Sequence, residues 1–122
     1  MNINKKKIFI ALLLVVILTS SAFAEMAQNF KLVNSSGRTF RSVWVGPSSN
    51  RRWSDADKVN MNPLKSGWHT TITFHNRNRR NVRYWDLRVD LTNGKKWEWH
   101  DLDLFEIYEI EIDRYGTAHY SR

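Results

Sequence analysis

Apolar and polar residues alternate with a period of two along most of the chain after residue 28. The clearest examples run from Trp68 to Phe74 and from Trp85 to Leu91. A period of two places successive side chains on opposite faces of an extended strand. Clusters of Gly, Pro, Asn and Ser interrupt the pattern about every 8–15 residues, as expected for short antiparallel strands. No segment has the spacing of a long amphipathic helix, so the pattern predicts an all-β fold.

The extended segments define a small antiparallel β-sandwich with six to eight strands and hairpin connections. We expect one short helical turn near residues 55–59, with Ser54 as its N-cap. The expected strands are 29–34, 38–46, 68–75, 82–91, 95–100, 102–112 and 117–120. The expected core contains Phe30, Leu32, Trp44, Ile72, Phe74, Trp85, Leu87, Val89, Leu104, Ile110 and Ile112.

The dipeptide Asn93-Gly94 predicts a hairpin but leaves its register open. With a two-residue loop, Trp97 and Trp99 would face solvent and form a platform for ligand stacking. With a three-residue loop, the register shifts by one and both indoles fall on the core face. A bulge near residues 100–101 would then return Leu102 to the core. Because hiding two indoles is worth several kcal/mol, we expect at least one of them in the core.

The N-terminal residues have the three-part pattern of a secretory signal. Three lysines, Lys5 to Lys7, precede an uncharged apolar run of 11 residues from Ile8 to Leu18. A membrane-spanning helix needs about 20 residues, so this run is too short to be one. Small residues follow, with Ala22 and Ala24 placed for cleavage after Ala24. We expect residues 1–24 to be a cleaved signal helix and residues 25–122 to be a single domain, periplasmic or extracellular.

The chain has no cysteine, so neither a disulfide framework nor a thiol nucleophile is available to it. The charges are unevenly distributed: residues 38–83 carry ten basic and two acidic side chains, and residues 84–113 carry three and nine. Two outcomes are open. Either the two halves remain apart and leave a basic surface, or their strands lie side by side and the charges pair.

The first hypothesis for function is a non-enzymatic binding or structural module of unknown ligand. Arginines beside aromatic rings suit an anionic partner such as a polysaccharide, a lipid surface or an acidic protein. Nucleic acid fits poorly, because the chain is expected to be exported and carries no nucleic-acid motif. No catalytic residue, metal site or cofactor is assigned. The candidate ligand-binding residues are Arg51, Arg52, Trp53, Arg77, Arg79, Arg80, Arg83, Trp97 and Trp99.

The alternative hypothesis is a small metal-dependent or hydrolytic enzyme. His100, Asp101 and Asp103 place one imidazole and two carboxylates within four residues. Carboxylates two apart on a strand share a face and can ligate calcium. Solvent-facing acids on a strand explain the same residues without a metal, so this alternative ranks second.

The order of motifs resembles a family of small exported bacterial β-domain proteins of uncharacterised function. The resemblance spans residues 30–112 and rests on Phe30-x-Leu32-x-Asn34, Val43-x-Val45-Gly46-Pro47-Ser48, Trp85-Asp86-Leu87-Arg88-Val89 and Asp101-Leu102-Asp103-Leu104. It implies a cysteine pair near Tyr84 and Phe105, which this chain lacks, so aromatic packing is expected there instead. Some members are labelled argininosuccinate lyase, a large helical tetramer with shared active sites. A single small β-domain cannot build such a site, so we reject that activity.

Overall fold

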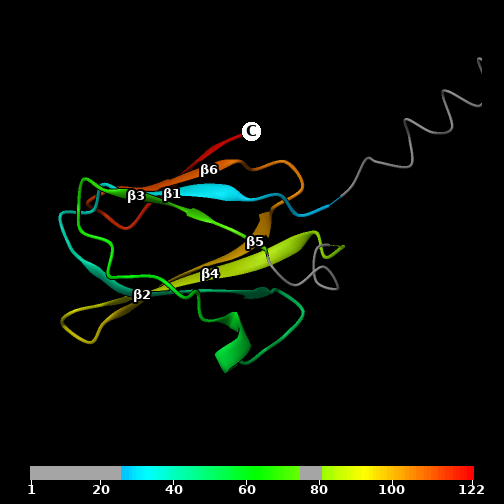
Figure 1. Ribbon diagram of the computed structural model, residues 1–122, viewed down its shortest axis with the longest axis horizontal. Helices are drawn as coiled ribbons and strands as arrows, with labels where there is room; N and C mark the ends of the chain where they lie inside the picture. Colours follow the sequence, from blue (N-terminus) through cyan, green and yellow to red (C-terminus); the bar gives the residue numbers. More distant parts are fainter. Residues whose placement is uncertain (1–25, 75–80) are drawn as a thin grey trace, which may run out of the picture.

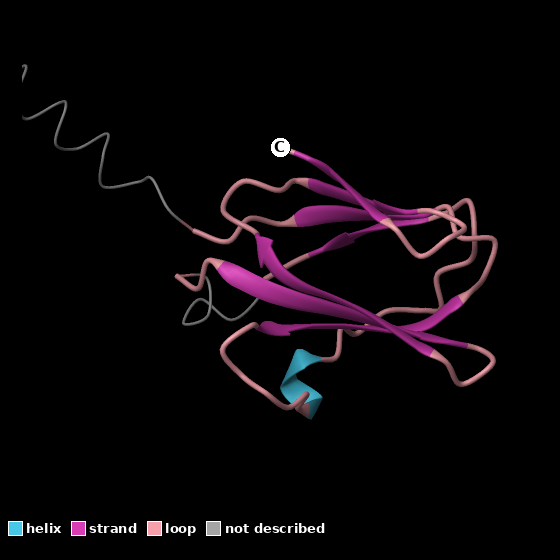
Figure 2. Cartoon of the chain, turned by 180° about the vertical axis from the view of Figure 1, so that it is seen from behind, coloured by secondary structure: helices cyan, strands magenta, loops and turns pink. Residues whose placement is uncertain are grey.

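A computed structural model describes residues 26–74 and 81–122 of the chain. The expected signal helix (residues 1–24) and the arginines Arg77, Arg79 and Arg80 lie outside these residues. The described part forms two β-sheets that face each other, as Figures 1 and 2 show. None of its helices has the length and apolar character that crossing a membrane requires.

Seven strands make up the two layers, and the predicted β-sandwich is confirmed. The upper sheet of Figure 1 has the order β3-β1-β6-β7, and the lower sheet has the order β2-β4-β5. The strands are β1 (Phe30–Asn34), β2 (Phe40–Pro47), β3 (His69–Ile72), β4 (Tyr84–Leu91), β5 (Lys96–Asp103), β6 (Glu109–Ile112) and β7 (Ala118–Ser121). The expected helical turn is the 3-10 helix η1 (Asp55–Asp57), which lies beside the outer face of the lower sheet.

The connections are more varied than hairpins alone. Consecutive strands pair as hairpins at β4–β5 and β6–β7, whereas β1, β2, β3 and β4 alternate between the sheets. β1 lies inside the upper sheet, antiparallel to β3 and parallel to β6. The parallel pair joins residues almost 80 positions apart, a pairing that local periodicity cannot reveal.

The core fills the space between the sheets. The expected core residues are buried except for two, since Phe74 is only partly buried and Trp44 is not in the core. Leu91 and Leu102 are buried too, as the alternation of β4 and the predicted bulge led us to expect. Core members that the sequence pattern did not single out complete the layer: Ala27, Phe40, Val43, Val45, Leu64 and Ile107. Two tight turns next to the strands rely on glycine at positive φ, Gly37 at 75° and Gly94 at 84°.

Trp44 lies on the outer face of β2, which corrects the sequence prediction. The register of β2 against β4 shifts between Phe40 and Ser42. This irregularity reverses the alternation, because an extra residue in one strand moves every later side chain to the other face. Phe40 therefore stays inside, while Val43 and Val45, rather than Trp44, point into the core.

The expected extended run over residues 102–112 is also wrong, because it is two strands joined by a turn. Residues 102 and 103 end β5, and β6 begins only at Glu109. The carbonyl of Asp103 accepts the amides of Glu106 and Ile107 at 3.2 and 3.0 Å, and its carboxylate accepts that of Phe105. The turn carries the chain from the lower sheet to the upper one, and Ile107 closes the end of the core.

Of the two loop lengths that the sequence left open for the β4–β5 hairpin, the structure has the three-residue loop. Leu91 bonds to the carbonyl of Lys95, and Val89 and Leu87 lie opposite Trp97 and Trp99. Both indoles are therefore on the inner face, where they are half-buried against the core. Asp101 adopts φ of 57° at the predicted bulge, and Leu102 returns to the core opposite Trp85.

Candidate binding site on the outer face of the lower sheet

The outer face of the lower sheet carries a cluster of ionisable side chains from adjacent strands. Alternation along β4 places Asp86, Arg88 and Asp90 opposite the core residues. The register set by the three-residue hairpin loop places Glu98 and His100 of β5 on this outer face as well. Five ionisable side chains from two adjacent strands therefore share one face.

An arginine–tryptophan stack, made of Arg88, Trp44 and Trp53, occupies the middle of this face. The Arg88 guanidinium lies 4.8 Å from the ring centre of Trp44 and 6.0 Å from that of Trp53. The Trp53 indole nitrogen donates to Glu98 at 3.1 Å. Cation–π contacts of this kind hold a ring in place. Trp53, which comes from the loop after β2, is thus anchored to both β4 and β5.

Asp90 ties the stack to the sheet. Its carboxylate, with 8% of the side chain exposed, accepts Arg88 Nε at 2.9 Å, Ser42 Oγ at 2.7 Å and Trp44 Nε1 at 3.0 Å. Burial alone would raise the pKa of Asp90, but these hydrogen bonds outweigh it and lower the pKa below its ordinary value. Asp90 is therefore a charged structural anchor for the stack.

A hollow of about 240 Å³ opens beside the stack, between the loop after β2 and the ends of β4 and β5. Three acids line it: Asp57, which is 4% exposed, and Asp86 and Glu98, whose side chains are 14% and 37% exposed. The His100 side chain, which also lines the hollow, is 58% exposed. Arg51 and Arg52 also line it and are exposed. Neither arginine has an ion-pair partner within the described residues. The hollow thus has acceptor oxygens at its floor and two unpaired cations at its rim.

His100 stands between two of these acids, Asp86 and Glu98. Its Nδ1 lies 3.0 Å from Asp86 Oδ2, and its Nε2 lies 3.5 Å from Glu98 Oε2. Ser48 Oγ donates to the other oxygen of Asp86 at 2.7 Å. Ser48, Asp86 and His100 are thus adjacent, with the carboxylate of Asp86 between the hydroxyl and the imidazole. In a hydrolytic triad the imidazole must stand between the other two to take the hydroxyl proton, so this order favours binding over nucleophilic catalysis.

We expect the pKa of His100 to depend on Asp86. The hydrogen bond with Asp86 raises the pKa of His100 above its ordinary value, against a smaller opposing effect of burial. The stabilisation from protonated His100 is therefore full below about pH 6.5 and is lost as the pH rises through the raised pKa. In an NMR titration of the imidazole, Asp86→Asn should lower this pKa by more than Glu98→Gln, because the Glu98 contact is longer. Unchanged titration in Asp86→Asn would contradict the pairing.

Asp86 titrates in the opposite sense. Burial would raise its pKa, but hydrogen bonds from Ser48, His100 and the Asp101 amide together lower it. A lowered pKa means that the stabilisation is present above the ordinary Asp range and is lost on acidification. The Asp86–His100 pair is therefore complete between the lowered pKa of Asp86 and the raised pKa of His100, where the carboxylate is ionised and the imidazole is protonated.

The other candidates from the sequence are placed elsewhere. Arg83 Nη2 forms an ion pair with Asp103 at 2.8 Å, and its guanidinium lies 5.6 Å from the rings of both Tyr84 and Phe105. The bond to Asp103 raises the pKa of Arg83. Arg83 is thus a bridge between β4 and the end of β5, at the position where the family resemblance implied a cysteine pair.

The cluster proposed for an enzyme is divided in the structure. His100 contacts Asp86 and Glu98, whereas Asp103 contacts Arg83. In the chain as described, no three or more His, Asp or Glu side chains are arranged to hold a metal ion. Asp101 is exposed at the bulge, so the three residues do not meet at a common point.

Trp97 and Trp99 do not form the exposed platform that the two-residue loop would have given. The Trp99 indole nitrogen donates to the carbonyl of Gly116 at 3.0 Å, and the two indoles meet edge to face at 6.4 Å. Trp97 also packs edge-on against Phe40. These rings close the side of the sandwich between β5 and the β6–β7 hairpin, which is a structural role.

Sequence reasoning missed three contributors to the outer face: Arg88, Glu98 and Trp44. The signal for the first two was present, because each alternates with core residues once the hairpin register is known. Trp44 could not be found in this way, since the irregularity in β2 moves it to the outer face.

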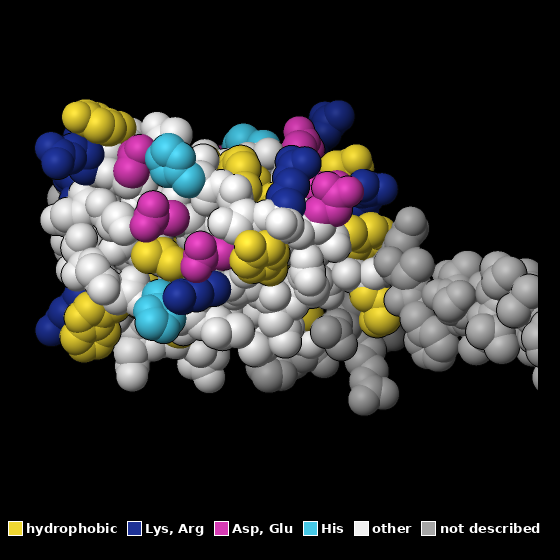
Figure 3. Space-filling view, turned by 90° about the horizontal axis from the view of Figure 1, so that it is seen from above, with side chains coloured by type: hydrophobic (Ala, Val, Ile, Leu, Met, Phe, Trp, Pro, Cys, Tyr) yellow, Lys and Arg dark blue, Asp and Glu magenta, His cyan; other side chains and the backbone are white. Residues whose placement is uncertain are grey.

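The upper sheet presents a different outer face, of mixed charge. Figure 3 shows acidic, basic and histidine side chains interspersed over it. Lys31 lies 3.6 Å from Glu109 across the β1–β6 pair. The Arg83–Asp103 pair joins the basic segment 38–83 to the acidic segment 84–113. Among the described basic residues of the segment 38–83, only Arg83 forms an ion pair with the acidic half, so the predicted charge pairing is seen at that position alone. Arg41, Arg51 and Arg52 form neither an ion pair nor a cation–π contact with other described residues, and of these three Arg51 and Arg52 line the hollow.

Comparisons with known proteins reveal a distant structural neighbour and no family. No family model matches the chain, and no curated protein matches it. The chain is similar to a solved structure described as the NMR structure of the protein from Eubacterium rectale, with a TM-score of 0.49 and 18% identity over 80% of this chain and 87% of that one. A likeness this distant carries no argument about the site, so function is argued from the residues themselves.

Proposed function

We propose that this protein is an exported, non-enzymatic binding module whose outer-face hollow holds a sugar unit of an acidic polysaccharide. The observation that carries the proposal is the position of Arg51 and Arg52, which have no ion-pair partner among the described residues, at the rim of a hollow that has a fixed indole in its wall. The family resemblance and the export signal stay predictions, and both agree with a ligand found outside the cytoplasm.

The rim supports the anionic part of the ligand. Guanidinium groups bind carboxylate, sulfate or phosphate through paired hydrogen bonds. Arg83 and Arg88, by contrast, are ion-paired to Asp103 and Asp90. No described residue forms an ion pair with Arg51 or Arg52, so their guanidinium groups are available to a ligand.

The floor supports the sugar part. Carboxylates and an imidazole accept and donate hydrogen bonds to hydroxyl groups, and Asp86, Glu98 and His100 line the hollow together. Trp53 adds an apolar wall, which is the usual mixture in small-molecule sites. A purely anionic ligand would be repelled by Asp86 and Glu98. A sugar acid can instead direct hydroxyls to the acids and its charge to the arginines.

The concave shape favours a polysaccharide over a lipid surface, because a flat bilayer cannot enter a hollow of about 240 Å³. The enzyme alternative finds less support. Ser48 donates to Asp86 rather than to His100, and Asp103 is engaged by Arg83. No observation favours hydrolysis over binding.

Retention on immobilised heparin and alginate in a salt gradient tests the proposal. The double variant Arg51→Ser/Arg52→Ser should bind at least about tenfold more weakly, because each charge-assisted hydrogen bond contributes about 1.5–3 kcal/mol. The matched control is Lys95→Ser/Lys96→Ser, which removes the same charge from the exposed tip of the β4–β5 hairpin. The control should elute close to the unmodified protein.

Three results would count against the proposal. Equal losses in both double variants would mean non-specific attraction by net charge. A loss only in Arg77→Ser/Arg79→Ser/Arg80→Ser would move binding out of the hollow. Stronger retention on phosphatidylglycerol vesicles than on either polysaccharide, abolished by Arg51→Ser/Arg52→Ser, would identify the ligand as a lipid surface.

A further inference from the structure

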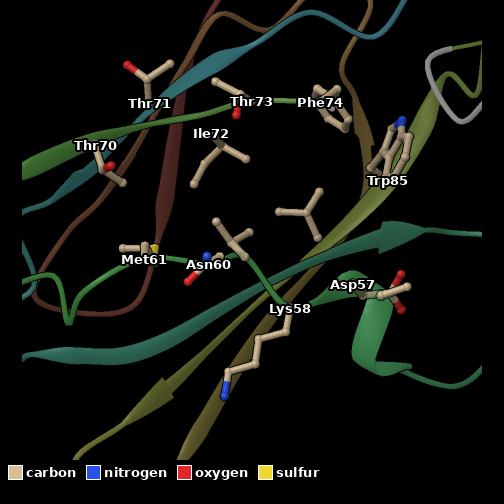
Figure 4. A pocket seen from close by; sticks show the side chains of 13 residues that line it. Asp57, Lys58, Asn60, Met61, Thr70, Thr71, Ile72, Thr73, Phe74 and Trp85 are labelled. Atoms are coloured by element: carbon tan, nitrogen blue, oxygen red, sulfur yellow. The ribbon is translucent and has the colours of Figure 1, made fainter. Parts of the chain in front are cut away.

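The two open sides of the sandwich differ. On one side Trp97 and Trp99 fill the gap between the sheets. On the other side lies a groove of about 320 Å³. It runs between β3, which is an edge strand of the upper sheet, and residues 56–61, which follow the edge of β2. Figure 4 shows Ile72 of β3 on one side of the groove, Met61 on the other and Trp85 at its end.

The inner wall of the groove is apolar and its rim is polar. Val45, Val59, Met61, Ile72, Phe74 and Trp85 contribute apolar side chains. Thr70 and Asn60 add polar groups, and Figure 4 shows the Lys58 side chain extending away from the groove. A groove that reaches the core through Ile72 and Trp85 offers a place for apolar side chains of a ligand.

The backbone of β3 faces the same groove with unused hydrogen-bonding groups. The Asn34 amide donates to the carbonyl of Trp68 at 2.9 Å, and Leu32 and Phe30 then lie opposite Thr70 and Ile72. In an antiparallel pair, residues that bond to the partner strand alternate with residues that do not. The N–H and C=O groups of His69 and Thr71 therefore point away from β1, toward the free edge.

This edge also lacks the usual protection against pairing. Exposed edges in native sheets typically carry lysine, proline or a bulge. β3 reads His-Thr-Thr-Ile, with no lysine or proline, and its register against β1 is continuous. By contrast, the edge of β2 is covered where Lys58 and Leu64 bridge to Trp44 and Phe40. Within the described residues, β3 is an accessible edge next to an apolar groove.

We propose that the β3 edge binds an extended polypeptide segment, which adds to the upper sheet as a further strand. The backbone groups of His69 and Thr71 indicate what binds there. Their N–H donors and C=O acceptors repeat every second residue, which matches the backbone of an extended peptide. The backbone of the segment bonds to His69 and Thr71. Every second side chain points to the same side as Thr70 and Ile72, into the groove, so the segment has apolar residues at alternate positions.

The test uses a set of octapeptides in which threonine alternates with Leu, Ile, Val or Phe. Binding to the protein is followed by NMR titration and amide exchange. We expect protection of the His69 and Thr71 amides and a shift of the Trp85 indole signal. A peptide of the same sequence with N-methylated backbone nitrogens facing β3 should bind at least tenfold more weakly, because only its hydrogen-bond donors are removed.

A pair of protein variants gives the reciprocal control. Thr71→Pro removes an N–H that points away from β1 and that no described residue accepts, and proline is tolerated at the outward position of an edge strand. The Thr71→Pro variant should bind the peptides at least tenfold more weakly, whereas Thr71→Val should bind them as the unmodified protein does. If Thr71→Pro does not fold by circular dichroism, the N-methylated peptide decides the question. The proposal is overturned if no peptide binds below about 1 mM, if N-methylation has no effect, or if a folded Thr71→Pro variant binds normally.

Discussion

Asn34→Asp should lower the free energy of unfolding by at least about 3 kcal/mol, although the two side chains have nearly the same shape. Asn34 is fully buried, and its Nδ2 donates to the carbonyls of Arg38 and Leu64 at 2.7 and 2.9 Å. Its Oδ1 accepts the amide and hydroxyl of Ser36. Replacing Nδ2 by oxygen removes one donor from each of these carbonyls, which keep only the bonds from Ser36 Oγ and the Phe40 amide, and places a carboxylate oxygen against both of them in a buried site.

Asn93→Asp provides the matched control. Asn93 is exposed, and its Oδ1 accepts the Lys95 amide at 3.0 Å, a bond that a carboxylate can keep. The same chemical change should therefore alter stability by less than about 0.5 kcal/mol. Urea denaturation at neutral pH measures both variants. Similar losses for the two would mean that the Asn34 network contributes little to the fold.

Trp85→Ala should destabilise the domain by about 3–5 kcal/mol, a large share of the about 5–15 kcal/mol available to a domain of this size. The Trp85 ring is 1% exposed and meets Phe74 edge to face at 4.9 Å. Its indole nitrogen donates to the carbonyl of Val82 at 2.8 Å. The substitution leaves a cavity and removes the donor for that carbonyl, and no disulfide compensates.

Trp68→Ala makes the same change at an indole that is 57% exposed and contacts Lys65 at 5.4 Å. It should cost about 1 kcal/mol or less. Thermal unfolding followed by far-ultraviolet circular dichroism compares the two variants without depending on tryptophan emission. A midpoint for Trp85→Ala equal to that of Trp68→Ala would contradict the central place given to Trp85.

The fold class followed from alternation, because a two-residue period survives wherever a strand is regular. β4 shows this best, since Trp85, Leu87, Val89 and Leu91 are all buried as expected. The predictions that were wrong fall at irregular positions. The register shift after Phe40 put Trp44 on the outer face, and Asp103 ended a run that had seemed continuous. Such shifts depend on the partner strand, which the local sequence does not describe.

The site was predictable only in fragments. Arg51, Arg52, Trp53 and His100 were named from the sequence, but as parts of two rival hypotheses. The structure brings them to one hollow, because the loop after β2 folds over the end of β4 and β5. Which acid would meet His100 depended on hairpin register, and the answer is Asp86 with Glu98 rather than Asp101 with Asp103. Arg77, Arg79 and Arg80 stay predictions outside the described residues.

The position of β1 has a consequence for how the chain folds. β1 is the first strand to be made, yet one of its neighbours is β6, whose residues come almost 80 positions later. During synthesis, its central place in the upper sheet therefore stays vacant on one side until nearly the whole domain has emerged. Long-range closure of this kind slows folding and leaves apolar strands open to aggregation. A nascent domain of this design benefits from being kept unfolded by a chaperone until its last strands are available.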